Sequence, residues 1–191
     1  MAVGTAPLGG RRIAIPRPGD ARSSVLADLV RALGVAPLEM PVIAFEPAAA
    51  GGALDTALTA LDEYDWIVFT SATAVGIIAE RLAAGGPAGE AIATARIAAV
   101  GPATAAALAG RLRAPDFVPS DHQASTLGRE LLAGSTLDGQ RILLPAADIA
   151  SPALADARRE RWAAVTLVTA YLTVPGAGGA GLGAALLGGG A

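Results

Sequence analysis

Short apolar runs typical of strands alternate with helical segments along most of this chain, and this alternation limits its fold more than any other feature. Each strand-like run is followed by a segment with apolar residues at helical spacing, and the connections are short. Strands joined by short helical crossovers form a parallel sheet whose two faces are both covered by helices. The predicted fold class is therefore α/β, with a flavodoxin-like or Rossmann-like sheet.

The first predicted unit is a strand over residues 11–17 followed by a helix over residues 19–34. The helix has an apolar stripe of Val25, Leu29, Val30 and Leu33 and ends at Gly34. The later elements expected, in chain order, are an extended segment at 36–47, a helix at 53–64, a strand at 65–71, a helix at 72–86, a strand at 95–101, a helix at 102–113, a strand at 115–120, a helix at 123–134, a strand at 140–147, a helix at 151–162 and a strand at 163–175.

Two segments rich in small residues divide this series. They cover Glu46–Leu54 and Leu172–Gly181, and we interpret them as linkers around a self-sufficient domain. The first unit, residues 12–41, has two strands and one helix and cannot bury its own faces. This unit therefore needs other parts of the structure to pack against its exposed faces.

Composition excludes several classes of function. There is no cysteine and only one histidine, which excludes thiolate chemistry and a histidine-rich metal site. All basic residues are arginines, so a Schiff-base lysine and a phosphate-loop lysine are also excluded. A net charge of −3 gives no general attraction to nucleic acid. No apolar run reaches the roughly 20 residues of a membrane span, and the N-terminus lacks a signal-peptide pattern, so we expect a cytoplasmic protein that does not bind membranes.

Candidate site residues lie where predicted strands give way to helices. Ligands of parallel sheets collect at these carboxyl ends, where helix N-termini present free N–H groups. Thr70 and Ser71 end one strand, and Gly101 and Thr104 begin the helix after the next. Each pair could face a ligand, or could simply start its helix by capping.

Two further residues are candidates of another kind. Arg17, after the first strand, could bind an anion or could be a solvated arginine. The hydroxyl of Tyr171 could reach a cleft between domains, or the ring could be half-buried in a sheet. Asp148, after the strand that contains Pro145, is better explained as a residue that starts a helix.

Four segments taken together carry a resemblance. The segments "IPRPGD", "DWIVFTSATAV", "AVGPATAAAL" and "LLPAADIASPALADARRERWAAVTLVTAYLTV" occur in this order along nearly the whole chain. This pattern resembles the uroporphyrinogen-III synthase family.

The resemblance implies two α/β domains joined by a two-stranded linker, the first of them discontinuous. Domain one would start with residues 1–42 and return at 173–191, domain two would cover 50–168, and the linkers would be about 43–49 and 169–175. The family pattern continues after "LTVP" with another strand–helix series, so we expect domain one to be incomplete here.

The resemblance also implies an activity: cyclisation of hydroxymethylbilane to uroporphyrinogen III, with loss of water and inversion of the terminal pyrrole ring, without metal or cofactor. Such an enzyme is a lyase of tetrapyrrole and haem biosynthesis, and we expect a monomer. The substrate carries eight carboxylates, which helix N-termini, hydroxyls and arginines can bind. By resemblance, Tyr171 assists departure of the hydroxyl, and the substrate-binding residues are Arg17, Thr70, Ser71, Gly101 and Thr104.

Two alternatives remain open at this point. The chain could be a non-catalytic fragment or tetrapyrrole-binding α/β module in which an intact second domain persists without the chemistry. It could also be an unrelated flavodoxin-like regulatory domain, although it lacks the acidic cluster and the lysine of a receiver domain.

Overall fold

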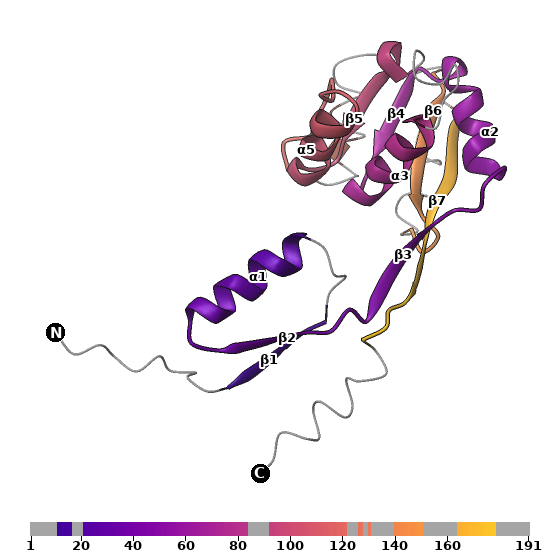
Figure 1. Cartoon of the computed structure of the whole chain (residues 1–191). Helices are drawn as coiled ribbons and strands as arrows, with labels where there is room; N and C mark the ends of the chain where they lie inside the picture. The colour runs from indigo at the N-terminus through magenta and orange to yellow at the C-terminus, as the bar shows by residue number, and fades with distance from the viewer. Residues whose placement is uncertain are drawn as a thin grey trace. The chain divides into compact units, whose positions relative to one another are not determined.

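The structure is a computed structural model that describes residues 11–16, 21–83, 92–121, 126–127, 130, 140–150 and 164–178. Contacts divide the chain into two units. Unit 1 is Met1–Glu46 with Thr173–Ala191, and unit 2 is Pro47–Leu172. Their strands are mainly parallel and alternate with helices, which confirms the predicted α/β class (Figure 1).

Unit 1 contains one strand–helix–strand motif: β1 (Arg12–Ile15), α1 (Ala21–Ala32) and β2 (Ala36–Glu39). The strands pair in parallel from Arg12↔Ala36 to Ile15↔Glu39. Gly34 follows the helix with φ of 75°, a left-handed conformation that suits glycine after a helix end, as predicted.

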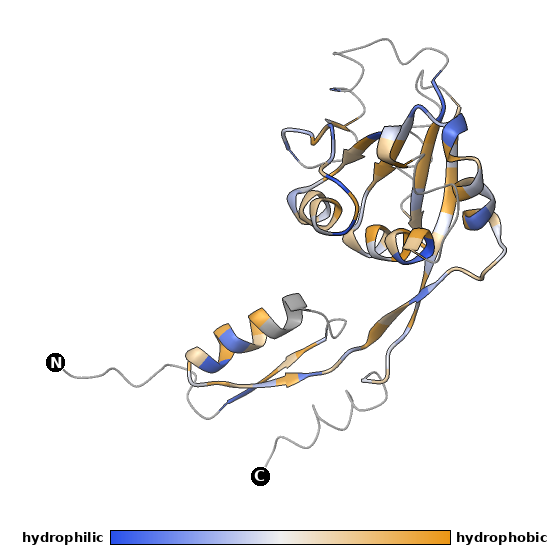
Figure 2. Ribbon diagram, turned by 45° about the horizontal axis from the view of Figure 1, so that its top comes forward, coloured by the Kyte–Doolittle hydropathy of each residue, from blue (hydrophilic) through white to orange (hydrophobic). Residues whose placement is uncertain are grey.

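The apolar stripe predicted on α1 is largely exposed. Val25, Leu29 and Leu33 are 61%, 60% and 60% exposed, whereas Ala27 is fully buried. Figure 2 shows hydrophobic residues along α1. This agrees with the expectation that two strands and one helix cannot cover their own apolar surface.

Two strands connect the units. They are β3 (Ile43–Pro47) and β7 (Val165–Pro175), which are neighbours in the sheet. The Ala48 N–H donates to the Ala170 carbonyl at 3.0 Å and the Gly176 N–H donates to the Val42 carbonyl at 2.9 Å. Residue numbers therefore rise along one strand as they fall along the other, so the two strands are antiparallel.

Two glycines after β7 allow a close backbone approach within unit 1. A Cβ at Gly176 would lie 2.2 Å from the Pro41 carbonyl oxygen, and one at Gly178 would lie 2.7 Å from Pro41 N. The predicted small-residue linker is thus a place where only glycine leaves room for the neighbouring backbone.

Unit 2 is built on a sheet of order β3-β7-β6-β4-β5 (Figure 1). Within this sheet, β4 is parallel to both β5 and β6, and β6 is parallel to β7. The described elements of this unit, besides β7, are α2 (Ala53–Thr59), the short 3-10 helix η1 (Leu61–Glu63), β4 (Trp66–Phe69), α3 (Ala72–Ala83), β5 (Arg96–Ala99), α5 (Pro102–Arg111) and β6 (Ile142–Ala147). No helix among the described residues is long and apolar enough to cross a membrane.

Some predicted elements differ from the structure. The strand predicted at 115–120 is wrong: only Phe117 forms an isolated bridge, with Ala98, because Pro115 and Pro119 have no N–H to extend a ladder. The helix predicted at 53–64 is interrupted at Ala60 and continues as η1. The helix predicted at 151–162 lies outside the described residues, as does most of the one at 123–134.

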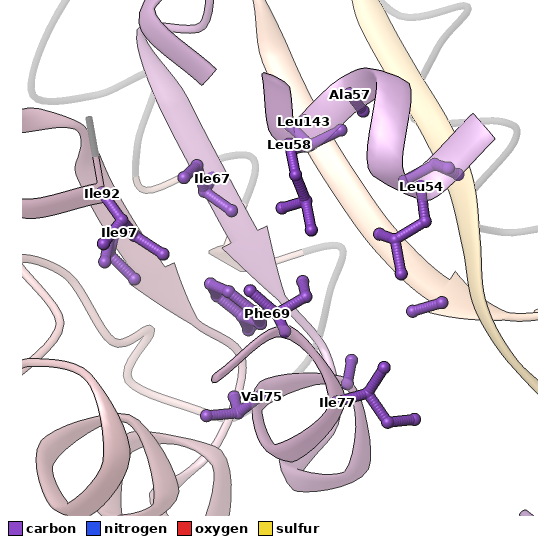
Figure 3. Packing of buried hydrophobic residues seen from close by; sticks show 14 of the residues in the cluster. Leu54, Ala57, Leu58, Ile67, Phe69, Val75, Ile77, Ile92, Ile97 and Leu143 are labelled. Atoms are coloured by element: carbon purple, nitrogen blue, oxygen red, sulfur yellow. The ribbon is translucent and has the colours of Figure 1, made fainter. Parts of the chain in front are cut away.

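Both faces of the unit 2 sheet are buried, and residues along β4 alternate between them. Ile67 and Phe69 pack with residues of α2, α3 and α5, while Trp66 and Val68 pack in a second cluster that includes Leu127. Figure 3 shows Phe69 close to Val75 and Ile77 of α3. Strands buried on both faces explain the continuous apolar runs seen in the sequence.

An acidic loop residue makes the stability of unit 2 depend on pH. Arg113 donates to both carboxylate oxygens of Asp116, at 3.1 and 2.9 Å, and the Ile97 N–H donates at 2.7 Å. The bonds from Arg113 lower the pKa of Asp116 despite its partial burial, and the Ile97 N–H lowers it further.

This carboxylate therefore contributes stability above its unfolded pKa of 3.8, and the contribution is lost as pH falls through the lower folded value. We expect Asp116→Asn to flatten the fall in unfolding free energy below about pH 5, measured by urea denaturation across pH. Asp62→Asn, at an exposed site on η1, is the control. An unchanged pH dependence in Asp116→Asn would contradict the prediction.

Candidate functional site

The order of strands in unit 2 creates a switch point between β4 and β6. The chain moves from β4 outward to β5 on one side, then returns to β6 and β7 on the other. The ladder between β4 and β6 covers Trp66↔Ile142 and Ile67↔Leu143. Further along β6, Pro145 has no N–H to donate. In sheets of this kind, ligands bind outside the carboxyl ends of the strands at the switch point.

Ser71 lies at this point, in the short turn between β4 and α3. Its Oγ accepts a hydrogen bond from the Ala74 N–H at 3.1 Å and thus caps α3. The same Oγ accepts the Tyr171 hydroxyl at 3.2 Å. Ser71 therefore caps the helix, which is one of the two roles that the sequence left open, and it also contacts the candidate residue Tyr171. Thr70, beside it, is half-buried.

Tyr171 reaches Ser71 because β7 is irregular. The register with β6 shifts from Ala146↔Thr169 to Ala147↔Tyr171, so Ala170 is an extra residue in β7. Regular alternation would put Ala170 and Tyr171 on opposite faces, yet both are buried in the cluster that contains α3. The bulge thus turns the Tyr171 side chain toward the start of α3. This irregularity has no simple signal in the sequence.

The start of α5 lies next to the end of β4. The Val100 N–H donates to the Phe69 carbonyl at 3.0 Å, which joins the two strand ends. Gly101 is the N-cap of α5 and has no side chain to cap it, and Pro102 has no N–H. The first N–H groups of α5 therefore have no side-chain cap, and they lie at the positive end of the helix dipole. Thr104, in this first turn, is 5% exposed.

The described arginines of unit 2 are engaged by other groups. Ion pairs join Arg81 to Asp55, Arg111 to Glu80, Arg113 to Asp116 and Arg141 to Glu63, while Arg96 lies 5.6 Å from the Trp66 ring centroid. Arg96 and Arg141 begin or precede strands, at the amino edge of the sheet. At the carboxyl edge, within the described residues, hydroxyls and helix N-termini are therefore the groups suited to an anion.

Comparisons with known proteins agree with one another. The family model for uroporphyrinogen-III synthase HemD matches residues 24–188. A curated uroporphyrinogen-III synthase from Synechococcus elongatus is 32% identical over 139 residues, which is 73% of this chain and 51% of that protein.

The chain belongs to the uroporphyrinogen-III synthase family.

Solved structures support this membership. A mutant uroporphyrinogen III synthase from Thermus thermophilus superposes with a TM-score of 0.62 at 25% identity, over 87% of this chain and 64% of that one. The uroporphyrinogen-III synthetase of Helicobacter pylori, at 16% identity and a TM-score of 0.53, shares the fold. The chain spans about half the length of its curated relative in the uroporphyrinogen-III synthase family.

The structure brings together most residues that the family resemblance singled out. Ser71 and Tyr171 are in contact, and Thr70 and Gly101 follow neighbouring strands. Arg17 lies outside the described residues. Asp148 is exposed after β6, and its N–H donates to the Tyr171 carbonyl at 3.0 Å. Among the described residues, no group of three or more acidic or histidine side chains could hold a metal ion.

Substitution of Ser71 tests its role as a cap in this member of the family. We expect Ser71→Ala to lower the free energy of unfolding by about 1 kcal/mol, because the Ala74 N–H and the Tyr171 hydroxyl both lose their acceptor. Urea denaturation measures this change, and Ser71→Asp, which restores a capping oxygen, should recover most of it. A Ser71→Ala protein as stable as the original would contradict the capping role.

Proposed function

We propose that this chain acts as a uroporphyrinogen-III synthase, a hydro-lyase that closes hydroxymethylbilane to uroporphyrinogen III with loss of water and inversion of the terminal pyrrole ring. The observation that supports this most is the Tyr171–Ser71 hydrogen bond at the switch point of unit 2. This bond lies at the N-terminus of α3, so it puts a phenol donor at a helix start in a chain of this family.

In this proposal Tyr171 is the catalytic residue. Its hydroxyl donates a proton to the departing hydroxyl of the substrate, so the carbon–oxygen bond breaks and water leaves. The electron-rich pyrrole supplies the electron pair that stabilises the resulting cation. The proton released when the new ring bond forms restores the phenol. The Ser71 oxygen fixes the direction of the phenol before the substrate arrives.

Substrate carboxylates would be bound by the groups at the carboxyl edge of the sheet. We propose that Thr70, Ser71, Gly101 and Thr104 contribute hydroxyls and N–H groups to them, and that Arg17 contributes a cation. Uncapped N–H groups at the start of α5 suit an anion because of the helix dipole. Holding the substrate folded is the larger part of the task, since geometry decides which ring position is attacked.

Ring closure by the purified 191-residue chain tests the activity. Freshly generated hydroxymethylbilane is supplied, the products are oxidised, and the isomers of uroporphyrin are separated. We expect isomer III above a blank without protein. Isomer I alone, in the same proportion as the blank, would contradict the proposed activity.

A second candidate function is binding without catalysis. It is favoured by one observation: unit 2 has its own buried core and itself contains the Tyr171–Ser71 contact. In that case the chain would quench the fluorescence of uroporphyrin III on titration while producing no isomer III. If the chain neither quenches the fluorescence nor produces isomer III, both candidate functions are contradicted.

We also propose the domain division, with 50–168 as domain two, residues 1–42 and 173–191 as parts of domain one, and linkers at about 43–49 and 169–175. It is supported by the contact division at Glu46/Pro47 and Leu172/Thr173 and by the exposed apolar stripe of α1. Limited proteolysis should cut residues 12–41 before 50–168. First cuts inside 50–168 would contradict the division. A monomer located in the cytoplasm completes the proposal.

A further inference from the structure

Arg81 contacts two separate segments of unit 2 from the end of α3. One nitrogen of its guanidinium donates to the Asp55 carboxylate of α2, and another donates to the backbone oxygen of Ala48, just after β3. The Arg81 side chain is 20% exposed and that of Asp55 is 31% exposed. The planar guanidinium can hold both acceptors at once, which a lysine cannot do with the same geometry.

Asp55 also binds the segment between β3 and α2. Its second oxygen accepts the Gly51 N–H at 2.5 Å, and Gly51 has a left-handed φ of 73°. The hydrogen bond from Arg81 lowers the pKa of Asp55, so the carboxylate stays charged at neutral pH. The segment from Ala48 to Gly51 is therefore fixed at both ends.

Ala48 links Arg81 to the bulge in β7. Its carbonyl accepts from Arg81, and its N–H donates to the carbonyl of Ala170 at 3.0 Å. Ala170 is the extra residue that turns Tyr171 toward Ser71. A slip of one residue in a strand moves its side chains to the other face. The bonds of Ala48 thus oppose the slip that would turn Tyr171 away.

Residues at both ends of α3 are therefore connected to Tyr171 or to its neighbour Ala170 by hydrogen bonds. At its start Ser71 accepts the Tyr171 hydroxyl, and near its end Arg81 holds the peptide that pairs with Ala170. The helix acts as a rigid spacer between these two attachments. We propose that Arg81 is a positioning residue for Tyr171, acting through Ala48 and the Ala170 bulge. The effect on catalysis rests on the proposed function, whereas the effect on the position of Tyr171 does not.

The first test measures the surroundings of Tyr171 directly. The chain has two tyrosines, so a sample with labelled tyrosine rings gives two sets of NMR signals, which Tyr64→Phe assigns. We expect Arg81→Met to shift or split the Tyr171 ring signals. The matched control is Arg113→Met, because Arg113 also bonds a carboxylate and backbone carbonyls, those of Ala95 and Ile92, at another place in unit 2. This control should leave the Tyr171 signals unchanged.

Two outcomes would overturn the proposal. One is an unchanged Tyr171 signal in a folded Arg81→Met protein, and the other is an equal change in Arg113→Met. If Arg81→Met fails to fold, Arg81→Lys replaces it, since it keeps the charge beside Asp55 but loses the forked geometry. The same shift of the Tyr171 signals is then expected, and its absence would overturn the proposal.

The second test separates catalysis from stability. In the ring-closure assay, we expect Arg81→Met to lower kcat for isomer III by roughly ten- to a hundredfold, with KM changed much less, because misplacement of a reacting group costs rate. Arg113→Met should retain kcat at a temperature where both variants are folded. A shifted Tyr171 signal in a chain that makes no isomer III would keep the positioning role and reject the proposed activity. A shifted signal with unchanged kcat would overturn the catalytic part of the inference.

Discussion

Replacing Tyr171 by phenylalanine should lower the rate of isomer III formation by about a hundredfold or more, because the proton donation that we propose for Tyr171 is lost. The ring itself is 7% exposed and packs in the core beside α3, and phenylalanine keeps that packing. The capping bond between Ser71 and the Ala74 N–H is also kept. The substitution therefore removes one hydroxyl and little else.

Tyr64→Phe is the control for this prediction. Tyr64 is the other tyrosine of the chain, and its ring centroid lies 5.4 Å from the guanidinium carbon of Arg141. Loss of its hydroxyl should leave the rate of isomer III formation unchanged. Initial rates with hydroxymethylbilane, corrected for spontaneous closure, measure both variants. A Tyr171→Phe rate within about twofold of the original would contradict proton donation by Tyr171.

Leu143→Ala should destabilise unit 2 by about 3 kcal/mol. Leu143 lies in the central strand β6, is fully buried, and packs in the cluster that joins the sheet to α2, α3 and α5 (Figure 3). Truncation to alanine leaves a cavity that rigid neighbours on β4 and β7 cannot fill.

Leu167→Ala is the matched control for the core. Leu167 lies on the neighbouring strand β7 and is 37% exposed, so the same truncation removes fewer buried contacts. Urea denaturation followed by circular dichroism should show a much larger loss of unfolding free energy for Leu143→Ala than for Leu167→Ala. Equal losses would contradict the assignment of Leu143 to the core.

The sequence predicted the parts of the fold that follow from local pattern. Fully apolar runs gave the inner strands β4 and β6, and Gly34, Gly101 and Pro102 marked helix ends that the structure contains. It failed at 115–120, where apolar Phe117 and Val118 suggested a strand but flanking prolines limit pairing to one bridge. The hydropathy pattern predicts which face of a helix or strand is buried and where the element ends. Whether a strand pairs depends on neighbours that are distant in the sequence.

The candidate site shows the same division. Ser71 and Gly101 could be selected because they follow strands, and parallel strands bring their carboxyl ends to one edge. The contact between Ser71 and Tyr171 joins residues 100 positions apart and depends on the bulge at Ala170. Alternation along β7 alone would have placed Tyr171 on the other face. The role inferred for Arg81 likewise depends on Ala48, which no motif marks.

Amide NMR of the chain during titration with uroporphyrin III tests most directly where a tetrapyrrole binds. We expect the largest shifts at the amides of residues 71–74, 103–104 and 171, around the carboxyl ends of β4 and β5 and the hydroxyl of Tyr171. Among the described residues of unit 2, the amino edge of the sheet, where Arg96 and Arg141 lie, offers an alternative place for an anionic ligand. Shifts confined to residues near Arg96 and Arg141 would contradict the account.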